Sequence, residues 1–259
     1  MAAGAGLALA AIGFGVAVAV TPQVEPSAAH GPKAGSQAPV SVSAQAAPLN
    51  ASAHTVSKSN TASASAPLPD APPELTPPAG RLWQRVVAQA DHGQHPFVIL
   101  DKRAAKVFVF NGAGRLQGES LVLLGLAVGD DSVPGIGQKA LANIRPAERT
   151  TPAGRFAAEP GINHEHEDIV WIDYDAAVSM HRLRASSAPA ERRPQRLASK
   201  SVADNRISYG CVNVPPSFYE AHIRPTLGKG GGVVYVLPET RSLEKQFPAL
   251  FGAERGSGA

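Results

Sequence analysis

Residues 30–80 contribute almost nothing to a hydrophobic core, and this restricts folding to the C-terminal part of the chain. The tract consists mainly of Ala, Pro, Ser and Thr and has very few large apolar residues. Such a segment cannot bury enough apolar surface to offset the conformational entropy that is lost on ordering. We therefore expect a disordered linker over 30–80 and one folded domain over 81–259, with its core at about 96–237.

An apolar run precedes this linker. Residues 4–20 are small or apolar and carry no charge, and no Lys or Arg precedes them, which is atypical of an export signal. About 20 apolar residues usually span a bilayer, and a run of this length also suits the core of a signal peptide. We expect residues 1–29 to be either a signal peptide or an N-terminal membrane anchor. Export followed by a spacer predicts a cell-envelope protein, periplasmic or on the outer face of the cytoplasmic membrane.

The pattern over 81–259 predicts a mainly β domain. Short runs rich in β-branched and aromatic residues alternate with turn signals, and we expect strands over 97–100, 107–110, 121–128, 169–174, 178–183 and 232–237. Helical spacing is limited to residues 81–90, to 217–223 and to a stretch near 243–250. Many strands and few helices predict a β-sandwich or an open barrel.

The chain has a single cysteine, Cys211. A lone thiol forms no intramolecular disulfide and no metal site by itself, so it is either inert filler or a nucleophile. Gly210 before it permits a sharp turn, and Pro215 and Pro216 after it suit the first turn of a helix. A thiol just before a helix N-terminus would be held toward the reactive thiolate by the helix dipole. This context favours a nucleophile.

A thiol nucleophile needs a base that works near neutral pH, and histidine is that base. Among the eight histidines of the chain, His181 lies in an apolar strand, where a polar ring needs a reason. His164 and His166 stand among carboxylates in a spacing that suits a divalent cation, but a solvated polar loop is the better interpretation. We expect His181 to serve Cys211, with no metal ion and no cofactor.

Residues 182–206 are basic, with seven Lys or Arg against Glu191 and Asp204. Basic stretches can bind nucleic acid, but an envelope setting and the lack of interleaved aromatic residues argue against it. We favour a solvated loop, with a loop that meets an anionic polymer as the alternative.

Three ordered motifs resemble the L,D-transpeptidase (YkuD-like) catalytic domain. They are Thr-Pro-Ala-Gly-Arg-Phe at 151–156, His181, and Ser-Tyr-Gly-Cys-Val-Asn at 208–213, and the resemblance spans roughly 96–237. It implies a mostly β catalytic domain over 81–259 with a short helix after the catalytic cysteine. It also implies a transferase that acts on peptidoglycan, and so a role in cell wall biogenesis and cell shape.

The same resemblance implies a mechanism. Cys211 would attack the carbonyl of the third residue of a tetrapeptide stem and release the terminal D-alanine. The acyl group would then pass to an amine of a second stem, which gives a 3-3 cross-link. Donor and acceptor stem peptides are therefore the expected partners, and an envelope protein could replace the acceptor.

The resemblance also assigns roles. His181 would be the general base, oriented by the backbone carbonyl of Arg182. Backbone amides around Tyr209, Gly210 and Cys211 would hold the oxyanion. Ser208 and Asn213 match the family motif and would brace the nucleophile turn.

The sequence departs from the family pattern in three places. Tyr209 stands where the family has histidine. Arg182 replaces a residue that is often small, which we expect to narrow one side of the site. The stretch from His181 to Ser208 is longer than usual, and we interpret residues 183–206 as an inserted, mobile loop over the cleft. Three alternatives therefore stay open: an L,D-carboxypeptidase that uses water, transfer to a protein lysine, and a non-catalytic peptidoglycan-binding module.

Overall fold

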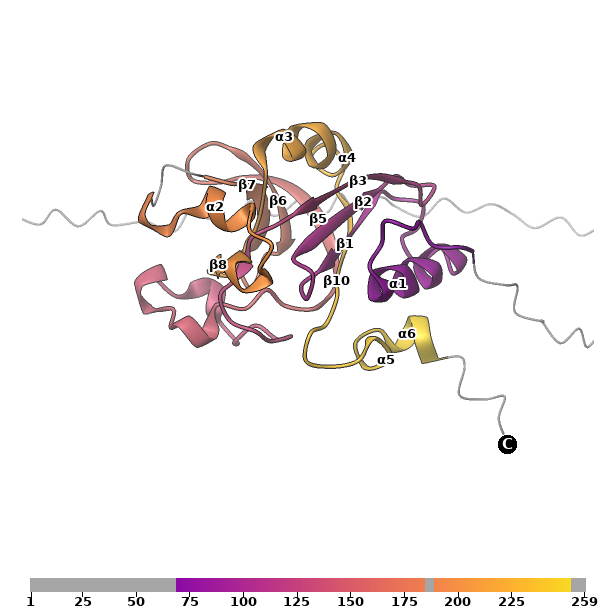
Figure 1. Ribbon diagram of the computed structural model, residues 1–259, viewed down its shortest axis with the longest axis horizontal. Helices are drawn as coiled ribbons and strands as arrows, with labels where there is room; N and C mark the ends of the chain where they lie inside the picture. The colour runs from indigo at the N-terminus through magenta and orange to yellow at the C-terminus, as the bar shows by residue number, and fades with distance from the viewer. Residues whose placement is uncertain (1–68, 185–188, 253–259) are drawn as a thin grey trace, which may run out of the picture. The chain divides into compact units, whose positions relative to one another are not determined.

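The computed structural model describes residues 69–184 and 189–252. These residues form a mostly β domain whose main element is a curled sheet (Figure 1). Its eight strands follow the order β3-β2-β1-β10-β5-β6-β7-β9. They are β1 (Phe97–Asp101), β2 (Lys106–Phe110), β3 (Leu116–Leu121), β5 (Gly154–Ile162), β6 (Asp168–Asp173), β7 (Val178–Arg182), β9 (Val212–Val214) and β10 (Gly232–Val236). The pairs β1–β10 and β7–β9 are parallel, and the other neighbours are antiparallel.

A single antiparallel bridge brings the two edges of the sheet together. Beyond β3, the amide of Leu123 donates to the carbonyl of Asn213 on β9 at 2.9 Å, and the amide of Asn213 donates back at 2.9 Å. A second, small sheet pairs β4 (Leu124–Gly125) with β8 (Arg206–Ser208) beside this closure. The predicted mainly β, open-barrel fold class is confirmed.

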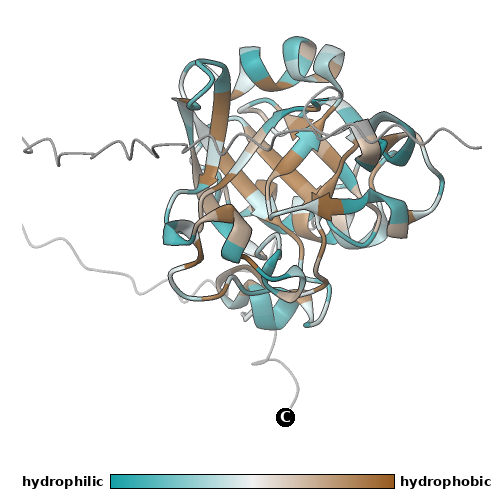
Figure 2. Cartoon of the chain, turned by 90° about the vertical axis from the view of Figure 1, so that its left-hand side faces the viewer, coloured by the Kyte–Doolittle hydropathy of each residue, from teal (hydrophilic) through white to brown (hydrophobic). Residues whose placement is uncertain are grey.

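Strand alternation separates two apolar cores. Val98 and Leu100 of β1 pack in the core enclosed by the sheet, whereas Phe97 and Ile99 face a second core outside it. This second core lies under α1 (Pro77–Ala88), α5 (Leu243–Gln246) and α6 (Pro248–Phe251). Because β1 is covered on both faces, its sequence is a continuous apolar run. Figure 2 shows apolar residues along the strands and polar residues on the surrounding loops and helices.

The leading helix differs from the predicted 81–90. It begins at Pro77, with prolines in its first turn, and it ends at Ala88. Ala79 and Gly80 are buried, so the packed domain begins before residue 81. The signal peptide or anchor predicted over 1–29, and most of the linker predicted over 30–80, lie outside the described residues. Within the described residues, no helix is long and apolar enough to cross a bilayer.

The helix predicted over 217–223 is present but irregular. It consists of α3 (Pro216–Phe218), a π-helical stretch η6 (Tyr219–Ile223) and α4 (Arg224–Thr226). Strand β9 separates it from Cys211. The remaining short helices are η1 (Ile136–Gln138), η2 (Leu141–Asn143), η3 (Pro146–Glu148), η4 (Pro189–Glu191), α2 (Arg193–Leu197) and η5 (Val202–Asn205).

Four buried charges join the strand ends near β8. Lys102, directly after β1, donates to Asp130 at 2.9 Å and to the carbonyl of Thr151 at 3.0 Å. Arg206 of β8 donates to Glu239 at 3.2 Å and to the carbonyl of Lys102 at 3.1 Å. Although burial raises the pKa of Asp130, hydrogen bonds from Thr240, Glu239 and Lys102 outweigh it and hold that pKa well below its usual range.

We predict that Lys102→Met destabilises the domain by about 3–5 kcal/mol, because breaking a buried ion network leaves uncompensated charges. The measurement is urea unfolding. Lys106→Met is the matched control, since Lys106 pairs with Glu119 on the surface and exposed pairs contribute less than about 1 kcal/mol. Equal losses in the two variants would contradict a structural role for the buried cluster.

Candidate active site

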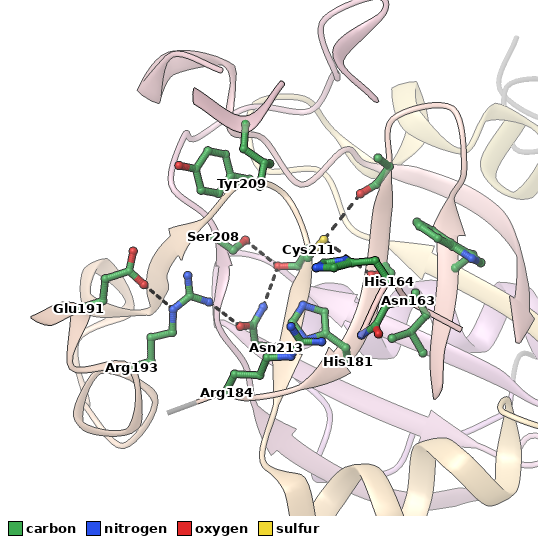
Figure 3. Close-up of a pocket in the computed structure, with 15 residues that line it drawn as sticks. Asn163, His164, His181, Arg184, Glu191, Arg193, Ser208, Tyr209, Cys211 and Asn213 are labelled. Atoms are coloured by element: carbon green, nitrogen blue, oxygen red, sulfur yellow. Dashed lines mark hydrogen bonds and ion pairs between the residues drawn. The ribbon is translucent and has the colours of Figure 1, made fainter. Parts of the chain in front are cut away.

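A cavity of about 540 Å³ opens at Cys211. Ser208, Tyr209 and Asn213 line it from the cysteine-containing stretch, and His181 lines it from β7. Figure 3 shows these side chains grouped around the Cys211 sulfur. Most of the site residues predicted from the sequence therefore line one cavity. Gly210 and Arg182 are not among its lining residues.

The turn that presents Cys211 requires glycine at position 210. Gly210 has φ +138°, and a Cβ atom there would lie 2.9 Å from the carbonyl oxygen of Thr150. The hydroxyl of Ser208 spans the turn, because it accepts from the amide of Gly210 at 3.1 Å and donates to the carbonyl of Cys211 at 2.6 Å. These contacts fix the backbone on both sides of the thiol.

Thr151 holds the same turn from below. It is fully buried, and its hydroxyl donates to the carbonyl of Gly210 at 2.7 Å while accepting from the amide of Gly125 at 2.9 Å. The carbonyl of Thr151 in turn accepts from buried Lys102. The Thr-Pro-Ala-Gly motif thus supplies the Thr151 hydroxyl, which is hydrogen-bonded to the turn at Gly210. The sequence of the motif does not reveal this role.

The parallel pairing of β7 with β9 sets which side chains meet. Met180 and Val212 are register partners and point into the core. Alternation along the strands therefore places His181 and Ser179 on the opposite face, together with Cys211. Nδ1 of His181 lies 2.8 Å from the carbonyl oxygen of Arg182. A proton on Nδ1 satisfies that carbonyl and leaves the lone pair on Nε2.

The thiol of Cys211 is half-buried and tuned by its neighbours. Burial alone raises its pKa, but hydrogen bonding and charge interaction with His181, and hydrogen bonds with Ser179, outweigh this and lower the pKa below its usual value. The hydroxyl of Ser179 lies 3.7 Å from Sγ. The predicted contribution of a helix dipole is wrong, because β9 lies between Cys211 and the first turn of α3.

One of the predicted oxyanion donors is already engaged. The amide of Gly210 donates to Ser208, whereas the amides of Tyr209 and Cys211 have no side-chain partner in the part of the chain that the structure describes. These two amides are the ones that could hold an oxyanion.

The first two departures from the family motif have structural explanations. The ring of Tyr209 packs against the guanidinium of Arg149, 4.0 Å from ring centroid to Cζ, and forms a wall of the cavity. The side chain of Arg182 points elsewhere, since it pairs with Asp168 at 3.0 Å and Glu220 at 2.5 Å and lies over Tyr219. The expectation that Arg182 narrows the cleft is therefore wrong.

The inserted segment is folded where it is described. Leu197 of α2 is buried, and Asn205 donates to the carbonyl of Val122 at 3.1 Å. Arg193 contributes to the cavity wall and donates from Nη1 to Oδ1 of Asn213 at 2.8 Å. The described residues of this segment pack against the domain and form one side of the cavity. Sequence reasoning did not single out Arg193, because nothing in the sequence shows which arginine of the basic run turns inward.

The His-x-His motif lies at the tip of the β5–β6 hairpin. The side chain of Asn163 accepts from the amides of Glu165 at 2.8 Å and Glu167 at 3.0 Å, which closes the turn. His164 reaches the cavity rim, with 86% of its side chain exposed. Residues 69–184 and 189–252 contain no group of three His, Cys, Asp or Glu placed to hold a metal ion.

No family model matches the sequence, and no curated protein matches it significantly. Solved structures that align with this chain include the helical cell shape determining protein Pgp2 from Campylobacter jejuni, at 14% identity and TM-score 0.39, with 61% of this chain and 52% of that chain covered. The catalytic domain of the E. faecium L,D-transpeptidase aligns at 18% identity and TM-score 0.30, over 56% of this chain and 98% of that one. An L,D-transpeptidase from Xylanimonas cellulosilytica aligns at 16% identity and TM-score 0.33, with 55% of this chain and 60% of that chain covered. This chain thus spans about half of Pgp2, and similarities this distant assign no function.

We predict that Thr151→Val loosens the nucleophile turn. The substitution removes the hydroxyl but keeps the shape, and each buried group left unpaired costs about 1–3 kcal/mol. Unfolding free energy and the rate of Cys211 alkylation by iodoacetamide should both fall. Thr151→Ser keeps the hydroxyl and should retain most of both; a serine variant as impaired as the valine variant would argue against this hydrogen bond.

We also predict that the pKa of Cys211 rises in Ser179→Ala and rises further in His181→Ala, because each substitution removes a group that stabilises the thiolate. The inflection of the iodoacetamide alkylation rate against pH should therefore move upward. His222→Ala serves as a control, since His222 packs against Phe218, away from the site. An unchanged inflection in His181→Ala would show that this histidine does not act on the thiol.

Proposed function

We propose that this protein is a cysteine acyltransferase of the cell envelope that acts on peptidoglycan stem peptides in the manner of an L,D-transpeptidase. The observation that carries the proposal is that the lone Cys211 and His181 line one cavity beside the paired strands β7 and β9, with Nδ1 of His181 held by the Arg182 carbonyl. The three ordered motifs supply the family resemblance, and two of them, at 151–154 and 208–213, are hydrogen-bonded to each other.

The geometry supports acyl transfer in two half-reactions. Nε2 of His181 takes the proton from the Cys211 thiol, and Sγ attacks the carbonyl carbon of the third stem residue. The oxyanion is stabilised by the amides of Tyr209 and Cys211. Collapse breaks the amide bond to the terminal D-alanine, whose leaving amine takes the proton from His181. A thioester remains on Cys211.

The second half-reaction reverses these roles. An acceptor amine loses a proton to His181 as its nitrogen attacks the thioester carbonyl, and the departing sulfur recovers that proton. The product is an amide, a 3-3 cross-link when the amine belongs to a second stem. The Tyr209 ring packs against Arg149, and we assign proton transfer in both halves to His181.

Two of the alternatives differ from this proposal in the acceptor that attacks the thioester. In the third alternative no thioester forms. Water would give an L,D-carboxypeptidase, and a lysine of an envelope protein would give a protein conjugate. A peptidoglycan-binding module without turnover would have no use for a thiol whose pKa is lowered by a positioned histidine, which favours the enzyme. The envelope location, and the signal peptide or anchor over 1–29, stay predictions.

We predict that the purified full-length protein, incubated with tetrapeptide muropeptides, gains a mass equal to the donor minus D-alanine. Cys211→Ala should abolish the adduct, and His181→Ala should lower its formation rate by about 10²–10⁴-fold. Intact-mass spectrometry measures the adduct, and the released product distinguishes a cross-linked dimer from a tripeptide.

His222→Ala is the control for a histidine outside the site. The proposal fails if the folded wild type shows neither adduct nor product while iodoacetamide still alkylates Cys211. Retention of peptidoglycan binding in that case would favour the binding module.

A further inference from the structure

The charged groups that line the cavity differ in how completely they are paired. Both terminal nitrogens of Arg184 form ion pairs with the hairpin carboxylates of Glu165 and Glu167, and the donor that it leaves without a partner among the described residues is its buried Nε. Its charge is therefore compensated within the protein. Glu191 lines the same cavity and pairs with Arg193.

Arg193 retains unused hydrogen-bonding capacity. A guanidinium carries five N–H donors. Nε of Arg193 donates to Glu191 at 2.5 Å and Nη1 donates to Asn213 at 2.8 Å. Nη2 has no acceptor among residues 69–184 and 189–252. The end of the guanidinium formed by Nη1 and Nη2 can therefore still receive an anion.

Asn213 holds the Arg193 guanidinium in the cavity that Cys211 also lines. Asn213, which accepts from Arg193, is fully buried and donates through Nδ2 to the carbonyl of Cys211 at 3.3 Å. Figure 3 shows the Arg193 guanidinium between Glu191 and Asn213. Only 15% of the Arg193 side chain is exposed, and a mostly desolvated guanidinium binds an anion more strongly than a solvated one.

We infer that Arg193 is a specificity-determining residue that binds a carboxylate of the peptide substrate next to Cys211. A carboxylate matches the planar donor geometry of a guanidinium. The inference rests on the proposed function for its substrate, since a stem peptide carries its chain-end carboxylate one residue beyond the attacked carbonyl. A side-chain carboxylate of the third residue offers the same chemistry, so the two sources need separate tests.

The first test does not depend on the proposed function. Because Cys211 is the only cysteine, its alkylation by anionic iodoacetate and by neutral iodoacetamide can be compared directly, each relative to free cysteine. Arg193→Gln should lower the iodoacetate-to-iodoacetamide rate ratio about fivefold or more. Arg193→Lys, which keeps the charge, should retain part of the preference and guards against loss of folding in the glutamine variant.

Arg192→Gln is the matched control, because Arg192 is exposed, lies one residue away and does not line this cavity. Its ratio should equal that of the wild type. An equal slowing of both reagents in Arg193→Gln would overturn the inference, since it would show that Arg193 only braces Asn213. The same ratio change in Arg192→Gln would overturn it too, because general surface charge would then account for the preference.

The second test uses tetrapeptide donors with a free or amidated chain end, and with a free or amidated side-chain carboxylate. The wild type should lose kcat/KM about tenfold or more for the one amidated position that Arg193 contacts, and Arg193→Gln should not discriminate at that position. Discrimination that persists in Arg193→Gln would overturn the inference. If no donor reacts with the wild type, the proposed function fails, and the alkylation ratios still decide whether Arg193 binds an anion.

Discussion

The nucleophile turn depends on a buried ion network that it does not contact directly. Lys102, Asp130, Arg206 and Glu239 bring together the ends of β1, β8 and β10. Burying charges is unfavourable unless each is paired and hydrogen-bonded, so the four groups hold one another in a single arrangement. Lys102 donates a hydrogen bond to the carbonyl of Thr151, and the Thr151 hydroxyl donates one to the carbonyl of Gly210. The buried ion network is thus connected through Thr151 to Gly210, the residue before Cys211.

The pairing of β7 with β9 places the imidazole of His181 and the thiol of Cys211 on the same face. The register of β7 and β9 buries Met180 against Val212 and leaves Ser179, His181 and Cys211 on the other side. A register slip by one residue would bury the histidine and expose the methionine. The burial of Met180 and Val212 in the apolar core therefore determines which side chains face the cavity.

This division explains how much the sequence alone could predict. The mainly β fold follows from short apolar runs and is confirmed, because alternation is a local property. The pairing of Arg206 with Lys102, 104 residues apart, leaves no local signal, and Arg206 was interpreted only as part of a solvated basic stretch. The dipole argument was wrong because three residues of β9 separate the thiol from the helix. Ser179 could have been found, since it stands two residues before His181 in a strand.

Asn213 links Arg193 to the stretch that carries Cys211. Its backbone closes the barrel against Leu123, and its side chain joins the Cys211 carbonyl to Arg193. His181 lies on β7 and Cys211 directly precedes β9, so the pairing of these two strands holds both side chains in place. Arg193 lies on a short helix in a segment fastened by a few hydrogen bonds, so its side chain can be exchanged with less effect on the nucleophile. Under the proposed function, the sheet would fix the reacting groups, and the inserted segment would supply the residue that recognises the substrate.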